Sequence, residues 1–327
     1  MMTRELGRSG ERIAAVGLGC MGMVGWYGER DDAEARATIA RALELGVTHL
    51  DTAAVYQNGD NERFVGECIR GVRPQVFLAT KCGMVRGANG LPGVDGRPET
   101  IRRSCDESLA RLGVEMIDLF YLHRIDRSVP IEDSMQAMAG LVAAGKIRHV
   151  GLSEASPETL RRAHAVHPVA ALQSELSLWT QSAARPALAV CAELGITFVA
   201  YSPLGRGFLP GGVTSTEALA ANDTRRLFPR FAEVHAAANQ AFAARLAELA
   251  EHIDCTPAQL ALAWVLAQGE RVVAIPGTKK RRWLEDNAAA ASLPLTPAQL
   301  AEIAGFLPES LVSGDRYPPS MLSALGG

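Results

Sequence analysis

The chain has 327 residues, of which 48% are hydrophobic and 21% charged, and its formal net charge is −3. This composition is typical of an ordinary soluble globular protein, and the slight negative charge gives no support for binding to nucleic acid or to a membrane surface. No apolar run reaches the roughly 18 residues of a membrane span, and the first residues lack the apolar core of a signal peptide.

The first expected element is a β-hairpin over residues 4–16, with Ser9 and Gly10 at its turn. After it, short apolar runs alternate with stretches whose apolar residues recur at helical spacing, as in residues 31–46 and 99–113. The expected strands are Val16–Cys20, Thr48–Ala53, Val76–Cys82, Ile117–His123, His149–Ser153, Ala171–Leu176, Thr197–Tyr201 and Val272–Ile275.

Eight strands separated by helices predict a parallel sheet with crossover helices. Units of roughly 30 residues repeated eight times favour a (β/α)8 barrel, and an open doubly wound sheet is the alternative. We expect a single domain over residues 1–327, with the barrel over about 14–292 and a C-terminal helix and tail over 293–327. Two long loops rich in Gly, Pro and Arg, Gly83–Pro98 and Gly205–Ala232, are candidate lids.

The sequence also contains a repeated pentapeptide and a glycine-rich motif. The pentapeptide Thr-Pro-Ala-Gln-Leu occurs at Thr256–Leu260 and at Thr296–Leu300, and each copy predicts a helix that starts with a capping box. Residues 17–22 match the G-x-G-x-x-G dinucleotide motif, but no helix start follows and the next strand-end acid is Asp51. We therefore expect these glycines to line the barrel after its first strand.

Six cysteines are scattered along the chain without a Cys-x-x-Cys pair, which indicates reduced thiols in a cytoplasmic protein. The seven histidines add no close-spaced ligand set, so no metal site is expected.

Four polar side chains stand at or just after the ends of consecutive strands. Asp51 ends the second strand, Tyr56 follows it, Lys81 ends the third and His123 ends the fourth. Catalytic groups of a (β/α)8 barrel lie at this end of the strands. A lysine held by an aspartate favours the phenolate of a nearby tyrosine, and a histidine can orient a carbonyl oxygen. Each residue alone has a structural explanation, but together they form a proton donor for a carbonyl that accepts hydride.

The motifs around these residues resemble the aldo-keto reductase family over nearly the whole chain, with most similarity to its perakine- and pyridoxal-reductase-like branch. The resemblance implies a catalytic tetrad at Asp51, Tyr56, Lys81 and His123. It rests on residues 51–56, 78–81, 120–124, 145–154, 173–179, 200–209 and 275–287.

The same resemblance implies an extended NADP(H) cofactor across the barrel mouth. Ser153 and Gln173 would hold the nicotinamide carboxamide, and Tyr201 would stack on the ring. The full set of implied cofactor contacts is Met21, Ser153, Gln173, Tyr201, Ser202, Leu204, Gly205, Arg206, Gly207, Gly277, Thr278, Lys279, Asp286 and Asn287.

Two positions depart from the family pattern: Glu154 replaces a frequent asparagine, and Trp283 stands where some branches have an arginine. The basic run 279–282 lies where the last barrel helix should start, and cations there oppose the helix dipole. A bound 2′-phosphate would relieve this conflict, which favours NADP(H) over NAD(H).

Substrate contacts are expected from the loops after the first, third and sixth strands. Their apolar and aromatic side chains suit a hydrophobic aldehyde or ketone, whereas Arg86 and Arg124 suit an anionic one. The candidate substrate residues are Met23, Trp26, Tyr27, Met84 and Trp179.

The sequence therefore predicts NADPH-dependent reduction of aldehydes or ketones, with Tyr56 as the general acid and the reverse oxidation possible. The alternative is a cofactor-bound regulatory or sensor subunit with slow turnover. The partner is a small carbonyl compound, and the sequence does not determine the oligomeric state.

Overall fold

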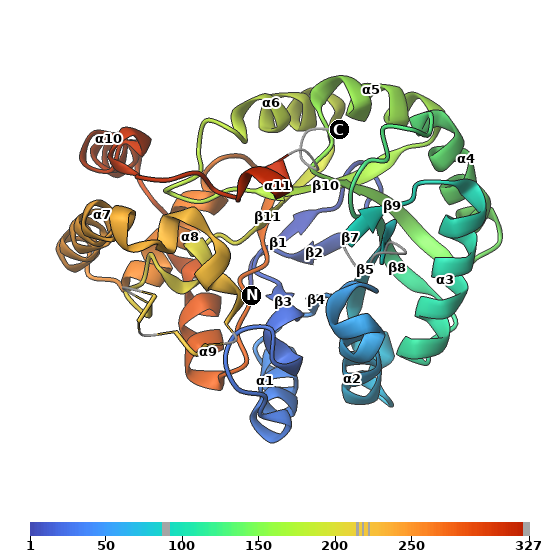
Figure 1. The fold of residues 1–327 in the computed structure, drawn as a ribbon, viewed down its shortest axis with the longest axis horizontal. Helices are drawn as coiled ribbons and strands as arrows, with labels where there is room; N and C mark the ends of the chain where they lie inside the picture. The colour runs from blue at the N-terminus through green and yellow to red at the C-terminus, as the bar shows by residue number, and fades with distance from the viewer. Residues whose placement is uncertain (87–91, 214–215, 218, 222, 323–327) are drawn as a thin grey trace.

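The computed structural model describes residues 1–86, 92–213, 216–217, 219–221 and 223–322. Eight parallel strands form one sheet in the order β12-β11-β10-β9-β8-β5-β4-β3. Parallel bridges from Val16 to Ala274 and from Gly19 to Gly277 join the two edge strands. The sheet is therefore a closed (β/α)8 barrel, ringed by helices in Figure 1, and the open doubly wound alternative is excluded.

The barrel strands fall on the eight predicted runs, although several are shorter than expected. They are β3 (Leu18–Gly19), β4 (His49–Asp51), β5 (Phe77–Cys82), β8 (Ile117–Leu122), β9 (Ile147–Ser153), β10 (Val169–Glu175), β11 (Thr197–Tyr201) and β12 (Val272–Ala274). The predicted N-terminal hairpin is also present, as β1 (Thr3–Glu5) paired antiparallel with β2 (Arg12–Ala14).

Eleven helices occupy the described residues, with α7 and α10 outside the ring in Figure 1. They are α1 (Asp32–Glu44), α2 (Asp60–Ile69), α3 (Pro98–Leu112), α4 (Ile131–Ala143), α5 (Pro157–Val166), α6 (Arg185–Leu194), α7 (Glu233–His252), α8 (Pro257–Leu266), α9 (Arg281–Ala289), α10 (Pro297–Phe306) and α11 (Pro319–Leu322). Short 3₁₀ turns are η1 (Met21–Val24), η2 (Tyr56–Gly59), η3 (Arg73–Gln75), η4 (Gly205–Gly207), η5 (Thr224–Leu227), η6 (Pro229–Phe231), η7 (Ala290–Ser292) and η8 (Glu309–Leu311). None of the described helices is long and apolar enough to cross a lipid bilayer.

Both copies of the repeated pentapeptide start helices with complete capping boxes, as predicted. The side chains of Thr256 and Thr296 accept hydrogen bonds from the backbone of Gln259 and Gln299, and the glutamine side chains accept in return. Each box satisfies backbone donors that a free helix end would leave without partners.

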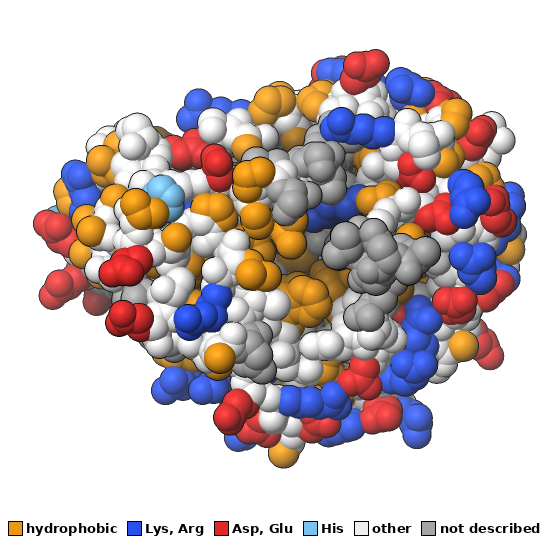
Figure 2. Space-filling model, viewed as in Figure 1, with side chains coloured by type: hydrophobic (Ala, Val, Ile, Leu, Met, Phe, Trp, Pro, Cys, Tyr) orange, Lys and Arg blue, Asp and Glu red, His pale blue; other side chains and the backbone are white. Residues whose placement is uncertain are grey.

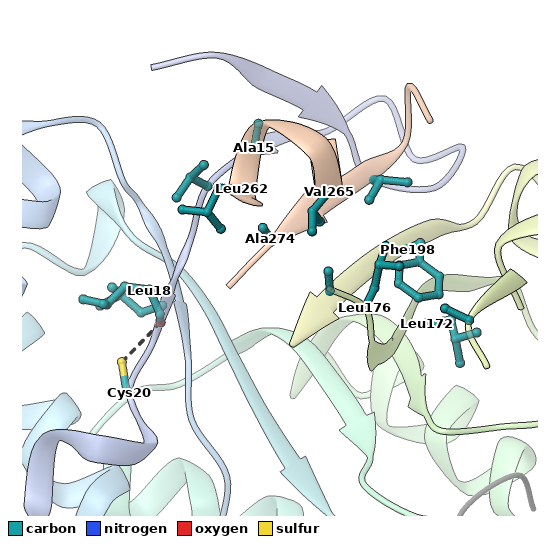
Figure 3. Packing of buried hydrophobic residues seen from close by; sticks show 14 of the residues in the cluster. Ala15, Leu18, Cys20, Leu172, Leu176, Phe198, Leu262, Val265 and Ala274 are labelled. Carbon is teal, nitrogen blue, oxygen red and sulfur yellow. Dashed lines mark hydrogen bonds between the residues drawn. The ribbon is translucent and has the colours of Figure 1, made fainter. Parts of the chain in front are cut away.

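Two apolar layers hold the barrel together. The larger lies between the strands and the helices, and Figure 3 shows Leu262 and Val265 of α8 packed near Ala274 and Phe198 of the sheet. The smaller fills the barrel interior and includes Leu6 of the hairpin. The hairpin thus closes the end of the barrel opposite the strand tips that carry the predicted site.

The glycines of the G-x-G-x-x-G motif serve barrel closure. A Cβ atom on Gly17 would lie 2.9 Å from the carbonyl oxygen of His49, and one on Gly19 would lie 2.9 Å from that of Ile275. Only glycine allows these backbones to approach so closely, and the chain continues into η1 rather than into a dinucleotide-binding helix. The dinucleotide interpretation is excluded, but Gly17 and Gly19 lie just before and at the end of the first barrel strand, and only Gly22 follows it, in η1.

The predicted long loops contain short ordered elements. The loop after β5 forms an antiparallel pair, β6 (Met84–Arg86) and β7 (Pro92–Val94), and residues 87–91 between them lie outside the described residues. The loop after β11 contains η4, η5 and η6 and leads directly into α7.

Candidate active site

Parallel strand register brings the four predicted catalytic residues to one end of the barrel. Asp51 is the last residue of β4, Lys81 lies near the end of β5, and His123 directly follows β8. Tyr56 starts η2, in the loop after β4. Lys81 pairs in register with Tyr121 of β8, so the three strand tips lie side by side. The predicted tetrad is therefore a spatial cluster.

Lys81 and Asp51 form a buried ion pair. The Lys81 ammonium donates to Asp51 Oδ1 and, at 2.9 Å, to the carbonyl oxygen of Thr52. Gln173 donates from Nε2 to Asp51 Oδ2 at 2.8 Å, so both carboxylate oxygens have partners. Burial alone would lower the pKa of Lys81, but Asp51 and Tyr56 outweigh it and the pKa is raised. The ammonium thus stays charged.

Tyr56 lies between this cation and the histidine. The Lys81 Nζ atom is 5.4 Å from the centroid of the Tyr56 ring, and the His123 ring meets that ring edge-on at 5.9 Å. Burial raises the pKa of Tyr56 above its ordinary value of 10, and the Lys81 charge only partly offsets this rise. The lysine acts in the expected direction, but burial dominates, and Tyr56 is held in its protonated, proton-donating form.

His123 is neutral at physiological pH. Burial, assisted by the charges of Arg124 and Lys81, lowers its pKa well below 6.5. Its Nδ1 atom is buried and has no hydrogen-bond partner among the described residues. A neutral imidazole keeps one N–H donor and one acceptor, so His123 can orient an oxygen beside Tyr56 without competing as a proton donor.

The predicted nicotinamide residues occupy neighbouring strand tips. Ser153 ends β9, and its hydroxyl accepts a hydrogen bond of 3.2 Å from Arg124. Gln173 lies on β10 and bridges to Asp51, as described above. Tyr201 ends β11, and its hydroxyl lies 2.9 Å from that of Tyr317. The structure brings these three predicted contacts to the tetrad.

The loop after β11 adopts an unusual backbone at several of the predicted cofactor contacts. Ser202 and Arg206 have left-handed φ angles of 49° and 57°. Gly205 packs so close to the indole of Trp179 that a Cβ atom would lie 2.6 Å from it. The Arg206 side chain is buried, with its guanidinium 3.4 Å from the carboxylate of Glu175. Such strained positions cluster at functional sites.

The remaining predicted cofactor residues are distributed over three loops and α9. Lys279 donates to the carbonyl oxygens of Tyr27 at 2.9 Å and of Glu29, and thereby ties the loop after β12 to that after β3. Asp286 instead accepts a hydrogen bond from the hydroxyl of Thr256, the N-cap residue of α8. The others are Met21 in η1, Leu204 and Gly207 around η4, Gly277 and Thr278 after β12, and the buried Asn287 in α9.

The basic run at the start of α9 borders a shallow depression of about 500 Å³ lined by Glu34, Lys280, Arg281, Arg282 and Glu285. Glu34 of α1 accepts from both the backbone N–H of Arg281, at 3.0 Å, and its guanidinium, at 2.9 Å. A carboxylate therefore already offsets part of the conflict between these cations and the helix dipole.

The predicted substrate residues divide into two groups. Trp26 lies at the mouth, 6.3 Å from the Tyr56 ring, whereas Tyr27 packs under Arg225 and Met84 is half-buried at the start of β6. Met23 and Trp179 have no exposed surface. Trp179 packs against aromatic rings behind the loop after β11, so these two residues support the wall and do not line it. The side chain of Arg86 lies outside the described residues.

The sequence analysis missed two residues of this region, Arg316 and Tyr317, which reach the mouth from the C-terminal segment. Their only local signal is a charged–aromatic pair between Gly314 and Pro318. Figure 2 shows hydrophobic side chains gathered around a hollow in this face, with a basic side chain at its edge. No cluster of metal-ligating side chains occurs in the described parts of the chain.

Comparison with known proteins agrees with this geometry. The model of the aldo/keto reductase family matches residues 15–308. A probable aldo-keto reductase from Glycine max is 43% identical over 317 residues, covering 96% of this chain and 91% of the relative.

Solved structures show the same fold. A glycerol dehydrogenase from Gluconobacter oxydans superposes with a TM-score of 0.86 at 28% identity, covering 97% of this chain and 98% of its own. The holo form of an aldo-keto reductase from Bacillus halodurans gives 0.77 at 26% identity, covering 98% and 99%. The chain belongs to the aldo/keto reductase family, whose members are oxidoreductases that act on carbonyl compounds.

Proposed function

We propose that the protein reduces aldehydes or ketones to alcohols with NADPH and that Tyr56 supplies the proton. The observation that carries this proposal is the buried Lys81–Asp51 pair beside a protonated Tyr56 and a neutral His123. A phenol can donate a proton, and the Lys81 ammonium 5.4 Å from the Tyr56 ring can stabilise the phenolate that remains.

Each member of the tetrad has a distinct task in this reaction. His123 orients the carbonyl oxygen, and Tyr56 donates its phenolic proton to that oxygen as negative charge develops there. Lys81 stabilises the phenolate that remains, and Asp51 keeps the ammonium charged and aimed. The bound nicotinamide supplies the hydride. A structural relative is a glycerol dehydrogenase, which supports the reverse, alcohol-oxidising direction as well.

The residues at the mouth fit an extended dinucleotide. Ser153, Gln173 and Tyr201 offer a hydroxyl, an amide and an aromatic ring next to the tetrad, in keeping with carboxamide and ring binding. Ser202, Gly205 and Arg206 adopt the left-handed backbone conformation that also occurs in anion-binding loops. Thr278 and Lys279 extend this surface towards the basic start of α9.

The start of α9 supports a preference for NADPH over NADH. Its three cations border the shallow depression, and only Arg281 is paired there with Glu34. A 2′-phosphate would meet the helix N-terminus and the remaining charges, although Glu34 would compete with it. Trp283, which is 47% exposed with the Arg282 guanidinium 4.1 Å above its ring, offers a flat surface for an adenine.

Hydrophobic or aromatic carbonyl compounds suit the aromatic surface that Trp26 and Tyr56 form at the mouth. Arg124 provides a second possibility, recognition of an anionic substituent, because it is charged and close to His123. We also propose a reducing, cytoplasmic location, because all six cysteines are free thiols.

The test is the loss of NADPH absorbance with a panel of apolar, aromatic and anionic aldehydes and ketones, with NADH in parallel. Rapid oxidation with at least one carbonyl compound, and a higher kcat/KM with NADPH, would support the proposal. Tight NADPH binding without turnover of any carbonyl compound would instead support the alternative of a regulatory, cofactor-bound subunit.

A further inference from the structure

The C-terminal segment 313–317 is anchored across the barrel mouth by buried polar groups. Asn239 of α7 accepts from the Ser313 backbone N–H and donates to its carbonyl oxygen, both at 2.9 Å. Arg230 donates to the carbonyl oxygen of Gly314 at 3.2 Å. Asn239 and Arg230 are buried, so breaking these bonds would leave them without solvent partners. The segment therefore has a defined place, and Figure 1 shows the following helix α11 near β10 and β11.

Two side chains of this segment contact the predicted nicotinamide residues. The Tyr317 hydroxyl lies 2.9 Å from that of Tyr201, which is expected to stack on the ring. Arg316 Nη2 donates to Glu154 Oε2 at 2.9 Å, and Glu154 directly follows Ser153, the expected carboxamide contact. The C-terminal segment thus reaches the side of the site where the reacting ring should lie.

Glu154 is buried and fixed in an unusual backbone conformation. Its φ angle is 53°, a left-handed value that favours glycine or asparagine over glutamate. Its second carboxylate oxygen accepts from the Ser174 hydroxyl at 2.8 Å and from the Glu175 backbone N–H at 3.0 Å. A buried carboxylate needs a cation, and Arg316 is the cation in contact with it.

Charged side chains of both signs lie around Tyr201. Glu154 is paired with Arg316, and Glu175 lies 3.4 Å from Arg206. The charge of Arg124 also acts on Glu154, but its hydrogen bonds to described residues go to the carbonyl oxygen of His123 and the Ser153 hydroxyl. Among these arginines, Arg316 is the one within hydrogen-bond distance of the Glu154 carboxylate.

We propose that Arg316 cancels the charge of Glu154 beside the nicotinamide, so that the C-terminal segment sets the preference of the site for the neutral, reduced cofactor over the cationic, oxidised one. This inference rests on the proposed function. A unit charge acting over roughly 10 Å at an effective dielectric constant near 20 changes the binding of a cation by about tenfold. The reduced ring carries no net charge, so its binding does not depend on this electrostatic interaction.

The test is the ratio of the dissociation constants of NADP⁺ and NADPH, measured by fluorescence titration or calorimetry at about pH 8 without substrate. Arg316→Gln removes one positive charge and should lower the ratio about tenfold, because NADP⁺ gains affinity. Glu154→Gln should raise the ratio by a similar factor. The double variant restores the net charge and should return the ratio to that of the wild type.

Two control variants separate charge from structure. Arg316→Lys keeps the charge and should leave the ratio near the wild-type value. Arg162→Gln removes an exposed partner of Glu132, far from the mouth, and should not change it. If Arg316→Gln does not fold, Glu154→Gln and the double variant still test the inference.

The inference is overturned if these variants change both dissociation constants by the same factor, or if the double variant retains an altered ratio. A wild-type protein that binds neither NADPH nor NADP⁺ would contradict the proposed function itself, and the inference with it. A wild type that binds both cofactors, with ratios unaffected by Arg316, would contradict only the inference.

Discussion

At the scale of single residues, burial sets the protonation states of the site. His123 is buried and Tyr56 partly buried at the mouth, and desolvation disfavours the charged form of each. Lys81 is the exception, since Asp51 keeps it charged in the same environment. The result is one cation beside a neutral acid and a neutral imidazole, which is the distribution that proton donation to a developing alkoxide requires.

This distribution predicts a flat pH profile for reduction. The raised pKa of Tyr56 keeps the acid protonated until the pH passes its ordinary value of 10, and the lowered pKa of His123 keeps the imidazole neutral well below pH 6.5. The kcat/KM for carbonyl reduction should therefore show no ionisation between about pH 6 and pH 9. An inflection near pH 6.5 would show that His123 titrates during turnover, contrary to this account.

Residue identities at strand ends were sufficient to predict that the four tetrad residues cluster, because parallel register places consecutive strand tips together. They were not sufficient for Trp179, which the sequence places after β10 like a mouth residue. Its ring packs against Phe208 and Phe231, at 5.1 and 6.2 Å between centroids. The sequence did not predict this packing of Trp179, because Phe208 and Phe231 lie in the loop after β11, whose path no local pattern determines.

At the scale of elements, the two Thr-Pro-Ala-Gln-Leu segments show how the surroundings of one motif change its contribution to stability. Both form complete capping boxes. Only Thr256 also donates from its hydroxyl to Asp286 of α9, at 2.9 Å. In addition, α8 is buried along most of its length, whereas α10 has one buried residue. The same pentapeptide therefore starts a core helix in one place and a peripheral helix in the other.

Replacing the two threonines should separate these contexts. Thr256→Ala should lower the free energy of unfolding by about 1–2 kcal/mol, because it removes both the cap and the link to α9. Thr296→Ala should lower it by about 0.5–1 kcal/mol, since it removes the cap alone. Urea unfolding of the two variants measures the difference. Equal effects, or a larger effect at Thr296, would contradict the contribution assigned to Asp286.

At the scale of the whole molecule, the hairpin closes one end of the barrel, and the proposed active site lies at the other. Arg4 of the hairpin donates to the carbonyl oxygens of Leu266 and Val272, at 2.7 and 2.6 Å, and to that of Gly269. These carbonyl groups lie at the end of α8 and the start of β12. The hairpin thus fastens the last strand of the barrel from the side away from the tetrad.

Arg4→Met should therefore affect stability and leave catalysis unchanged. It removes one hydrogen-bond donor from each of three carbonyl groups and should lower the free energy of unfolding by about 2–3 kcal/mol, while kcat stays at the wild-type value. Arg12→Met is the matched control, because Arg12 bonds only Thr3 within the exposed hairpin and should change stability by less than about 0.5 kcal/mol. A loss of kcat in Arg4→Met with little loss of stability would contradict the assignment of Arg4 to stability and not to catalysis.

Local sequence patterns were sufficient to predict the barrel, but they did not predict contacts between distant segments. Alternating apolar runs and helical periodicity predicted all eight strands, although β3 is shorter than expected where closely packed glycines close the sheet. The contact between Glu154 and Arg316 joins residues 162 positions apart. Neither residue carries a pattern that points to the other, so only the folded chain shows that the C-terminal segment belongs to the site.

The central claim is that Tyr56 is the proton donor in hydride transfer from NADPH to a carbonyl. The most direct test compares wild type and Tyr56→Phe in the single-turnover rate of NADPH oxidation with the best carbonyl substrate, together with the dissociation constant of NADPH. We predict a rate at least about 100-fold lower and a dissociation constant within about twofold of wild type. An unchanged rate in Tyr56→Phe would contradict the assignment of Tyr56 as the acid.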